Sequence, residues 1–486
     1  MTQTASGQGK TTMKRIFSWL TLAATAATAA CGADQLTVPN TNTPTNSGIT
    51  TNPRGGAQLL LNGIIASDRN ILDDYILGVG NFGRESFNIF PTDGRSVTGW
   101  YQNFSDDAGF GAGLFGGYYG NQRNVLGLEE LVQGSALFTA GEKAATSGFA
   151  RTEVALSLYY VITTRNIAGA PTRIATTPDT LFTFQSRDSV YSAITGNLDA
   201  GFANLTSAGA AFPFAYPGAQ FAGFTNPTTF GQFNRAIAAR VLATRGSLAT
   251  GAARTAFYTS ALTALNTSFI TATLTTANRN LGPAHIYSVV AGDSPNALFT
   301  QTANQGFYAN PNLQTAFGTD STLDNRYAYL ANAGLIVPFA SNVTSAKKIV
   351  RFPLQTSPIQ VITNEELYLL RAEASYFTGA TGAALTIINN VRTISGLAAR
   401  GAFASDADFI TELLTQRTRS LVGLGHRWAD TRRFGRLNTL PTSGLLFAKT
   451  ANMVITQQEC VVRSRQTDVA LACPAFTAVD PQNPTP

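Results

Sequence analysis

The chain has 486 residues and a formal net charge of +6 at pH 7. Lys10, Lys14 and Arg15 lie within residues 1–30, which contain no acidic residue, so the rest of the chain carries only +3. A surplus this small argues against nucleic acid as a partner. Charged residues make up only 13% of the chain, and the abundant Thr, Asn, Gln and Ser suit a surface that hydrogen-bonds neutral ligands.

Residues 1–30 have the pattern of an export signal. Lys14 and Arg15 supply positive charge, an apolar stretch begins at Ile16, and a run of small residues leads directly to Cys31. Signal peptidases recognise this order of charge, apolar segment and small-residue cleavage site. A cysteine at the first mature position can accept a lipid. We therefore expect residues 1–30 to be a lipoprotein signal peptide and Cys31 to be the lipidated residue.

This leader leaves two alternatives open. The signal is equally compatible with a start at Met13, and ordinary secretion would leave Cys31 without a lipid. Because Gly32, and not Asp, follows Cys31, sorting to the outer membrane is expected. No later stretch approaches the roughly 18 consecutive apolar residues of a spanning helix. The sequence thus predicts a protein held to the outer membrane by its lipid and exposed at the cell surface.

Residues 31–53 are expected to form the lipid anchor and a flexible tether. The stretch from Thr37 to Pro53 is dense in Thr, Asn and Pro, a composition that favours an extended linker over a packed core.

Several later segments have the apolar spacing of amphipathic helices, at i, i+3, i+4 and i+7. The apolar residues of these segments form stripes along one helix face, which begin at Leu156, Tyr191, Ala236, Ala384 and Ile410. Ser186 precedes the second stripe as a candidate N-cap. The sequence therefore predicts an all-α fold.

A sequence pattern that occurs twice predicts that the helices come in pairs. Around Gly251 and again around Gly379, a helical pattern ends at Thr-Gly-Ala and an Ala-rich helix follows. Glycine suits the left-handed residue after a helix end. Repeated units of this kind build tetratricopeptide-like folds. The pattern fades over residues 206–230 and 266–345, where long irregular loops are expected.

Specific motifs appear in the C-terminal third. Residues 365–374 read EELYLLRAEA, residues 389–392 read NNVR, and residues 413–436 read LLTQRTRSLVGLGHRWADTRRFGR. In this order they resemble the conserved helices of the SusD/RagB family. The turn at Thr164–Pro171 and the segment Leu36–Asn40 resemble upstream parts of the same family.

The resemblance implies a SusD-like helical region over residues 54–270 and a SusD/RagB-like region over residues 271–486. It also implies a nutrient-capturing outer-membrane lipoprotein that binds an oligosaccharide, or else a peptide. The implied partner is a TonB-dependent SusC-like transporter that receives this ligand. Two alternatives are a helical-repeat envelope scaffold that binds no nutrient, and a surface hydrolase.

The charged residues of these motifs are expected to be structural. Glu373, Arg427 and Asp430 lie in otherwise apolar helices, where a charge persists only if it is paired. Trp428 is expected in the core. The chain departs from the family pattern at three positions where glutamate is usual, namely Gln416, Ser420 and Leu424.

Signals for catalysis or cofactor binding are weak. The G-x-G-x-x-G strings at Gly78–Gly83 and Gly111–Gly116 lack the strand and helix of a dinucleotide site. His285 and His426 are the only histidines, and metal sites and hydrolase triads usually draw on histidine. We expect no cofactor, no metal and no enzyme activity.

Cys460 and Cys473 remain once Cys31 is assigned to lipid. An even remainder in an exported protein predicts one disulfide bond. Two free thiols are the alternative.

Aromatic residues outside the helical motifs are the candidates for ligand binding, because sugar faces stack on aromatic rings while amides bond the rim. Trp100 lies beside Tyr101 and Asn103, and Phe307-Tyr308 lies in the second irregular region. We expect these five residues to bind a neutral oligosaccharide, because the sequence contains no basic cluster. Ordinary packing is the alternative role for each ring.

Overall fold

Helices make up most of what the computed structural model describes, namely residues 49, 51–88, 113–175, 180–299, 307–336, 345–440, 451–474, 480 and 482–483. The α-helices in these ranges are α3 (Pro53–Phe82), α5 (Tyr118–Gly134), α6 (Ala140–Arg165), α7 (Arg187–Ser207), α8 (Pro227–Leu248), α9 (Gly251–Asn266), α10 (Pro311–Thr315), α11 (Asn364–Phe377), α12 (Thr381–Ile394), α13 (Asp406–Ser420), α14 (Arg427–Arg433) and α15 (Gln457–Ser464). The predicted helical fold is confirmed.

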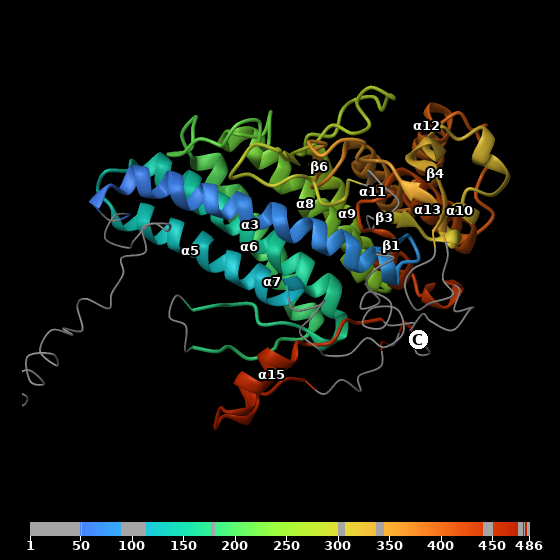
Figure 1. Ribbon diagram of the computed structural model, residues 1–486. Helices are drawn as coiled ribbons and strands as arrows, with labels where there is room; N and C mark the ends of the chain where they lie inside the picture. Colours follow the sequence, from blue (N-terminus) through green and yellow to red (C-terminus); the bar gives the residue numbers. More distant parts are fainter. Residues whose placement is uncertain are drawn as a thin grey trace, which may run out of the picture. The chain divides into compact units, whose positions relative to one another are not determined.

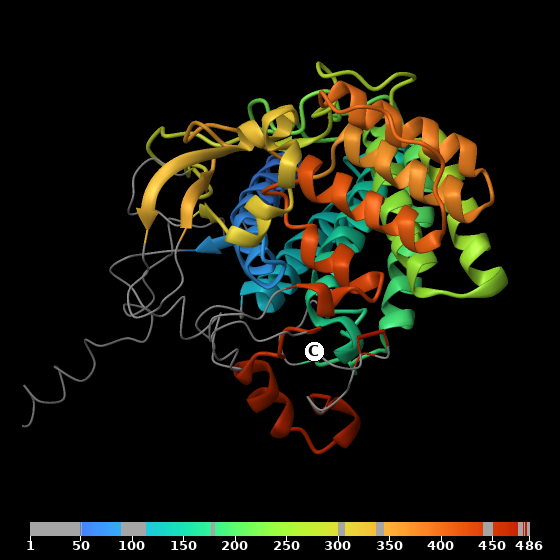
Figure 2. The same ribbon diagram turned by 90° about the vertical axis from the view of Figure 1, so that its right-hand side faces the viewer.

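The helices pack mainly against their neighbours in sequence. α6 lies against α7, α8 against α9, and α11 against α12, while α3 packs on α5 (Figures 1 and 2). α11 also contacts α8 and α9, which joins the C-terminal pair to the preceding ones. This succession of helix pairs is the tetratricopeptide-like arrangement that the sequence predicts.

Side-chain caps fix where several helices begin. Thr139 and Glu142 form a capping box at α6, in which each side chain accepts a hydrogen bond from the other residue's backbone N–H. The Ser186 hydroxyl accepts from the backbone N–H of Ser189 at 3.2 Å, so this predicted cap of α7 is confirmed. Such caps satisfy N–H groups that have no partner inside the helix.

Glycine shapes the turns inside two helix pairs. Gly251, at the start of α9, has φ +55°, and Gly379, between α11 and α12, has φ +91°. Both lie in the left-handed region that other residues rarely adopt. The turn positions expected from the two Thr-Gly-Ala sequences are therefore confirmed.

A small antiparallel sheet occupies part of the segment that the sequence suggested was irregular. Its strands run in the order β1 (Ser86–Asn88), β3 (Phe307–Ala309), β5 (Ser345–Ile349) and β4 (Leu330–Ile336). Phe87 pairs with Tyr308, and Tyr308 pairs with Lys348. A second, two-stranded sheet joins β2 (Ala284–His285) to β6 (Ile359–Gln360). The strands are too short to produce a clear alternating pattern in sequence.

The first irregular segment is packed on the core by its aromatic rings. The rings of Phe212 and Phe214 stack with their centroids 5.2 Å apart, and both pack on Phe149 of α6. Burial of several such rings fixes a loop that lacks regular backbone hydrogen bonding.

Residues Pro53–Pro486 form one compact unit, and the division of this unit at residue 270 stays a prediction. Among the described residues, no helix is both long enough and apolar enough to cross a membrane.

Candidate functional site

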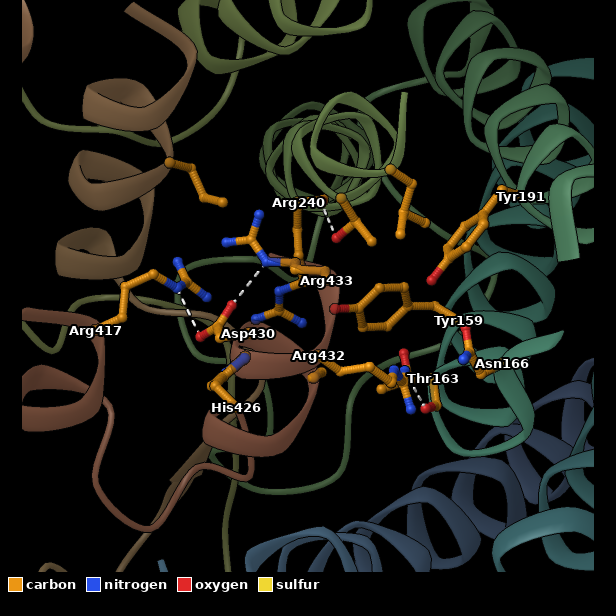
Figure 3. A pocket seen from close by; sticks show the side chains of 14 residues that line it. Tyr159, Thr163, Asn166, Tyr191, Arg240, Arg417, His426, Asp430, Arg432 and Arg433 are labelled. Atoms are coloured by element: carbon orange, nitrogen blue, oxygen red, sulfur yellow. Dashed lines mark hydrogen bonds and ion pairs between the residues drawn. The ribbon is translucent and has the colours of Figure 1, made fainter. Parts of the chain in front are cut away.

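A buried network of ion pairs joins α8, α11, α13 and α14. Arg240 of α8 donates to both carboxylate oxygens of Glu366 on α11, at 2.7 Å each. On α14, Asp430 lies between Arg417 and Arg433, with N–O distances of 2.7 and 3.0 Å (Figure 3). The Arg240–Glu366 and Arg417–Asp430 pairs join different helices, whereas Asp430 and Arg433 both belong to α14; all of these side chains are shielded from water.

The motif charges are structural, as predicted. Glu373 of α11 accepts from Arg433 at 2.8 Å and from the Tyr258 hydroxyl at 3.0 Å. Arg427 donates to the backbone oxygen of Arg84 and to Asn312, at 2.6 Å each. Both residues thus tie the C-terminal motif helices to distant parts of the chain.

The pKa values of Glu366 and His426 show which of these two buried side chains is charged. Burial alone would raise the pKa of Glu366, but the positive charge of Arg240, with contributions from His426 and Arg417, lowers it to about 2. Burial lowers the pKa of His426 to about 4 despite the nearby Glu366. At neutral pH, therefore, Glu366 is ionised and His426 is neutral.

A cavity of about 20 Å³ lies within this network. Tyr159, Arg240 and Asp430 line it together with Thr163 and Tyr191 (Figure 3). Since one water needs roughly 10–15 Å³ by this measure, the cavity can hold a water but no nutrient. The network holds helices together and is not a ligand site.

A larger groove of about 260 Å³ lies elsewhere in the compact unit. It is formed by three parts of the chain distant in sequence: the π-helical turn η3 (Gly113–Gly117) with the start of α5, the described loop residues 171–175 and 180–182, and α15. The residues that line it are Phe115, Gly116, Tyr119, Gly120, Arg123, Pro171, Arg173, Ile174, Ala175, Thr180, Leu181, Phe182, Glu459 and Arg463. π-Helical turns are rare and frequently occur at functional sites.

Aromatic rings form one wall of the groove. The ring centroids of Phe115 and Tyr119 are 4.9 Å apart in an edge-to-face arrangement, and Phe115 stacks on Phe184 behind it. The Tyr119 hydroxyl donates to the backbone oxygen of Pro171 at 2.6 Å. Burial raises the pKa of Tyr119, so this phenol stays protonated and holds the loop to α5.

Arginines gather at the same groove. Arg123 and Arg173 are exposed, and the Arg173 guanidinium lies 5.0 Å from the centre of the Phe182 ring. Within the described ranges neither of these two side chains makes an ion pair. Arg463 is buried and pairs with Glu459 at 2.7 Å, so its charge is compensated.

The C-terminal segment is fastened to the groove through α15. Arg463 donates to the backbone oxygens of Phe182 and Leu471, at 2.9 Å each. Cys460 and Cys473 are joined in the structure with their Cα atoms 5.4 Å apart, a separation that a disulfide bond spans. That the protein carries this bond in solution stays a prediction.

The residues predicted to bind ligand are not assembled into one described site. Trp100, Tyr101 and Asn103 lie outside the described residues, as does Cys31. Phe307 and Tyr308 are buried in β3, with exposed fractions of 2% and 0%. A ligand contact by any of these five residues stays a prediction, and the burial of the two β3 rings favours the packing alternative for them.

Sequence reasoning did not select the residues that line the groove. Two features that the sequence analysis singled out nevertheless lie next to this site. They are the turn that ends at Pro171 and the cysteine pair that encloses part of α15. The segment containing Trp100 also leads directly into η3 in the chain.

Part of this chain matches a known protein family, and its fold is similar to that of solved structures. Residues 355–471 match the model of the SusD family. Over these residues the chain matches the SusD/RagB family. No curated protein matches this chain. Among solved structures, a SusD superfamily protein from Bacteroides vulgatus is 13% identical, with a TM-score of 0.61, covering 84% of this chain and 97% of its own.

Two other solved structures have a similar fold. NanU of B. fragilis is 14% identical, with a TM-score of 0.63, covering 87% of this chain and 98% of its own. A SusD superfamily protein from B. fragilis is 16% identical, with a TM-score of 0.57, covering 86% and 95% respectively. At these identities the likeness establishes the fold of this chain and no more.

One departure from the SusD-family pattern has a structural reason. Ser420, where glutamate is usual, donates to Glu365 at 2.8 Å and accepts from Arg326 at 2.8 Å. Arg279 also binds Glu365, at 2.7 Å. A glutamate at 420 would place a second carboxylate against Glu365, so the smaller hydroxyl fits the ion pairs of this chain.

Proposed function

We propose that this protein binds an oligosaccharide in the groove formed by η3, the loop residues 171–175 and 180–182, and α15. The bound nutrient then passes to a TonB-dependent SusC-like transporter in the outer membrane. The observation that carries the proposal is the groove itself, a 260 Å³ recess with aromatic rings beside hydrogen-bonding groups. SusD-family proteins are binding proteins of nutrient uptake, which supports binding without catalysis.

The shape of the groove suits a sugar. The half-buried rings of Tyr119 and Phe182 offer apolar area to the faces of pyranose rings, and the buried Phe115 supports the Tyr119 ring. Gly116 and Gly120 are exposed, and a Cβ built on either glycine would meet no heavy atom within 4 Å. The missing side chains leave room for a ligand to approach the backbone closely.

The route to the membrane is part of the same proposal. A lipid on Cys31, followed by the tether to residue 53, would hold the binding unit beside the transporter at the cell surface. Cys31→Ser should release the protein from membranes, and labelling with a fatty-acid analogue should mark only the wild type. Equal labelling of the variant would refute the anchor without affecting the binding site.

A groove-filling substitution tests the binding site. Gly120→Trp should fill the groove and abolish glycan binding while leaving folding intact, because the site is open and glycine is a poor helix former. The matched control is Gly127→Trp, two turns along the same helix α5, where a Cβ also meets no heavy atom within 4 Å. Gly127 does not line the groove.

Glycan-array binding and thermal melting of both variants decide the outcome. Loss of binding in Gly120→Trp alone supports the proposal. Equal binding by both variants would remove the groove from the function. If the wild-type protein binds no glycan, the envelope-scaffold alternative is favoured, and turnover of a bound glycan would favour the hydrolase.

A further inference from the structure

We propose that the groove selects an acidic oligosaccharide, one whose sugars carry carboxylate groups, and that Arg123 and Arg173 recognise these groups. This inference rests on the proposed function and gives it a ligand class. An acidic ligand differs from the neutral ligand expected from sequence. Arg123 and Arg173 are distant in sequence, and folding brings them to one groove.

The charge balance of the groove is the first argument. Among the described residues, the charged residues that line it are Arg123, Arg173, Arg463 and Glu459. Glu459 is occupied by Arg463, to which it is bonded at 2.7 Å. Arg123 and Arg173 form no ion pair within the described ranges, so two positive charges among the described lining residues have no ionic partner there.

The chemistry of the arginine side chain is the second argument. A guanidinium is always charged at neutral pH and presents paired N–H donors that match both oxygens of a carboxylate. Arg173 is oriented over the face of Phe182, 5.0 Å from its centre, which restricts its motion and lowers the entropy lost on binding. Nearby rings supply the stacking surface, so one ligand satisfies both features only if it combines sugar faces with negative charge.

The buried Arg463 has a different role. Its bonds to Glu459, to Phe182 and to Leu471 hold α15 against the loop. Because these bonds occupy it, Arg463 is a positioning residue, and we assign ligand recognition to the two exposed arginines.

Calorimetry with two probes tests the inference. The probes are a trimer of galacturonic acid and the matching trimer of galactose, complemented by an array of acidic and neutral glycans. We expect the wild type to prefer acidic members of the array. Arg123→Gln with Arg173→Gln should weaken acidic binding about tenfold or more, since each arginine contributes a charge-assisted hydrogen bond. Binding by the wild type should also weaken as salt rises, and binding by the double variant should not.

Arg151→Gln is the matched control, because Arg151 is an exposed arginine of α6 outside the groove. It should leave both affinities unchanged. A preference for neutral glycans, or acidic binding that survives in the double variant, overturns the inference while leaving the proposed function standing. If no glycan of either kind binds the wild type, the proposed function itself fails.

Discussion

Arginines have opposite roles in two regions of this molecule. In the ion-pair network of α8, α11, α13 and α14, Arg240, Arg417 and Arg433 are buried and each bonds a carboxylate. In the groove, Arg123 and Arg173 are exposed and face the recess without a described ionic partner. The first set is expected to hold helices together, and the second to bind a ligand.

The difference follows from the free energy of desolvation. A charge taken out of water must find a partner or lose its charge, so buried arginines are committed to the fold. An exposed arginine keeps its water until a ligand replaces it, and its contribution appears only on binding. The presence of an arginine in a sequence therefore says little about function until its partners are known.

The largest effect is expected where a buried pair is broken. Glu366→Gln removes the carboxylate that Arg240 bonds twice, and leaves a buried cation uncompensated. The free energy of unfolding should fall by about 3–5 kcal/mol, measured by denaturant titration at neutral pH. Glu130→Gln, at an exposed position of α5, is the control and should have little effect. A loss of similar size in both variants, or in neither, would contradict the structural role of the network.

The second prediction concerns the cysteine pair beside the groove. Cys473→Ser opens the loop that encloses part of α15, and should lower the free energy of unfolding by about 3 kcal/mol or less. Because α15 carries Arg463, glycan affinity should fall as well. A glycan affinity equal to that of the wild type would show that the bond does not support the groove.

Thiol titration checks the bond itself. Mature protein lacking Cys31 should show no titratable thiol when it is denatured without reductant. Two reactive thiols would mean that Cys460 and Cys473 are not joined.

The C-terminal network was largely predictable from sequence, and the groove was not. Glu373 and Asp430 stand in motifs of fixed spacing within one apolar stretch of chain, and buried charges must be paired. Arg123 and Arg173, by contrast, are ordinary surface arginines in sequence. Only folding brings α5, the loop after Pro171 and α15 together, so no local pattern marks them as a set.

The small sheet was missed for a related reason. β1 and β3 are three residues each and are separated by more than two hundred residues. Their pairing depends on contacts distant in sequence, whereas the helix pairs were visible because their apolar stripes and their turn glycines, such as Gly251, are local.

A third prediction concerns the pH dependence of stability that arises from two buried carboxyl groups. Asp68 of α3 and Glu153 of α6 are hydrogen-bonded to each other, and Asn121 donates to Asp68 at 2.6 Å. Burial raises the pKa of both carboxyls, most strongly for Glu153. The folded state therefore binds more protons than the unfolded state above the ordinary carboxyl pKa. The free energy of unfolding should fall as the pH rises from about 5 to about 8.

Glu153→Gln should remove much of this pH dependence and stabilise the protein at about pH 8 by roughly 1–3 kcal/mol. Its effect at about pH 5 should be small. Denaturant titrations at both pH values measure this, with Glu130→Gln as the control. An unchanged slope against pH in Glu153→Gln would mean that the pair does not retain a proton.

The smallest effect on the fold is expected from Trp100→Ala. If the segment leading into η3 contributes a stacking surface to the groove, glycan binding should weaken by about 1–3 kcal/mol, the scale of one large aromatic contact. Thermal stability should change little. If the variant unfolds, Trp100 belongs to the core, and if affinity is unchanged it lies outside the site.

The most direct test compares the two sets of arginines in one experiment. Glycan affinity and melting temperature are measured for Arg123→Gln with Arg173→Gln and, separately, for Arg240→Gln. We predict that the groove variant loses acidic-glycan affinity at an unchanged melting temperature, while Arg240→Gln melts well below the wild type. A groove variant that melts as low as Arg240→Gln, or one that binds acidic glycans as tightly as the wild type, would contradict this division of roles.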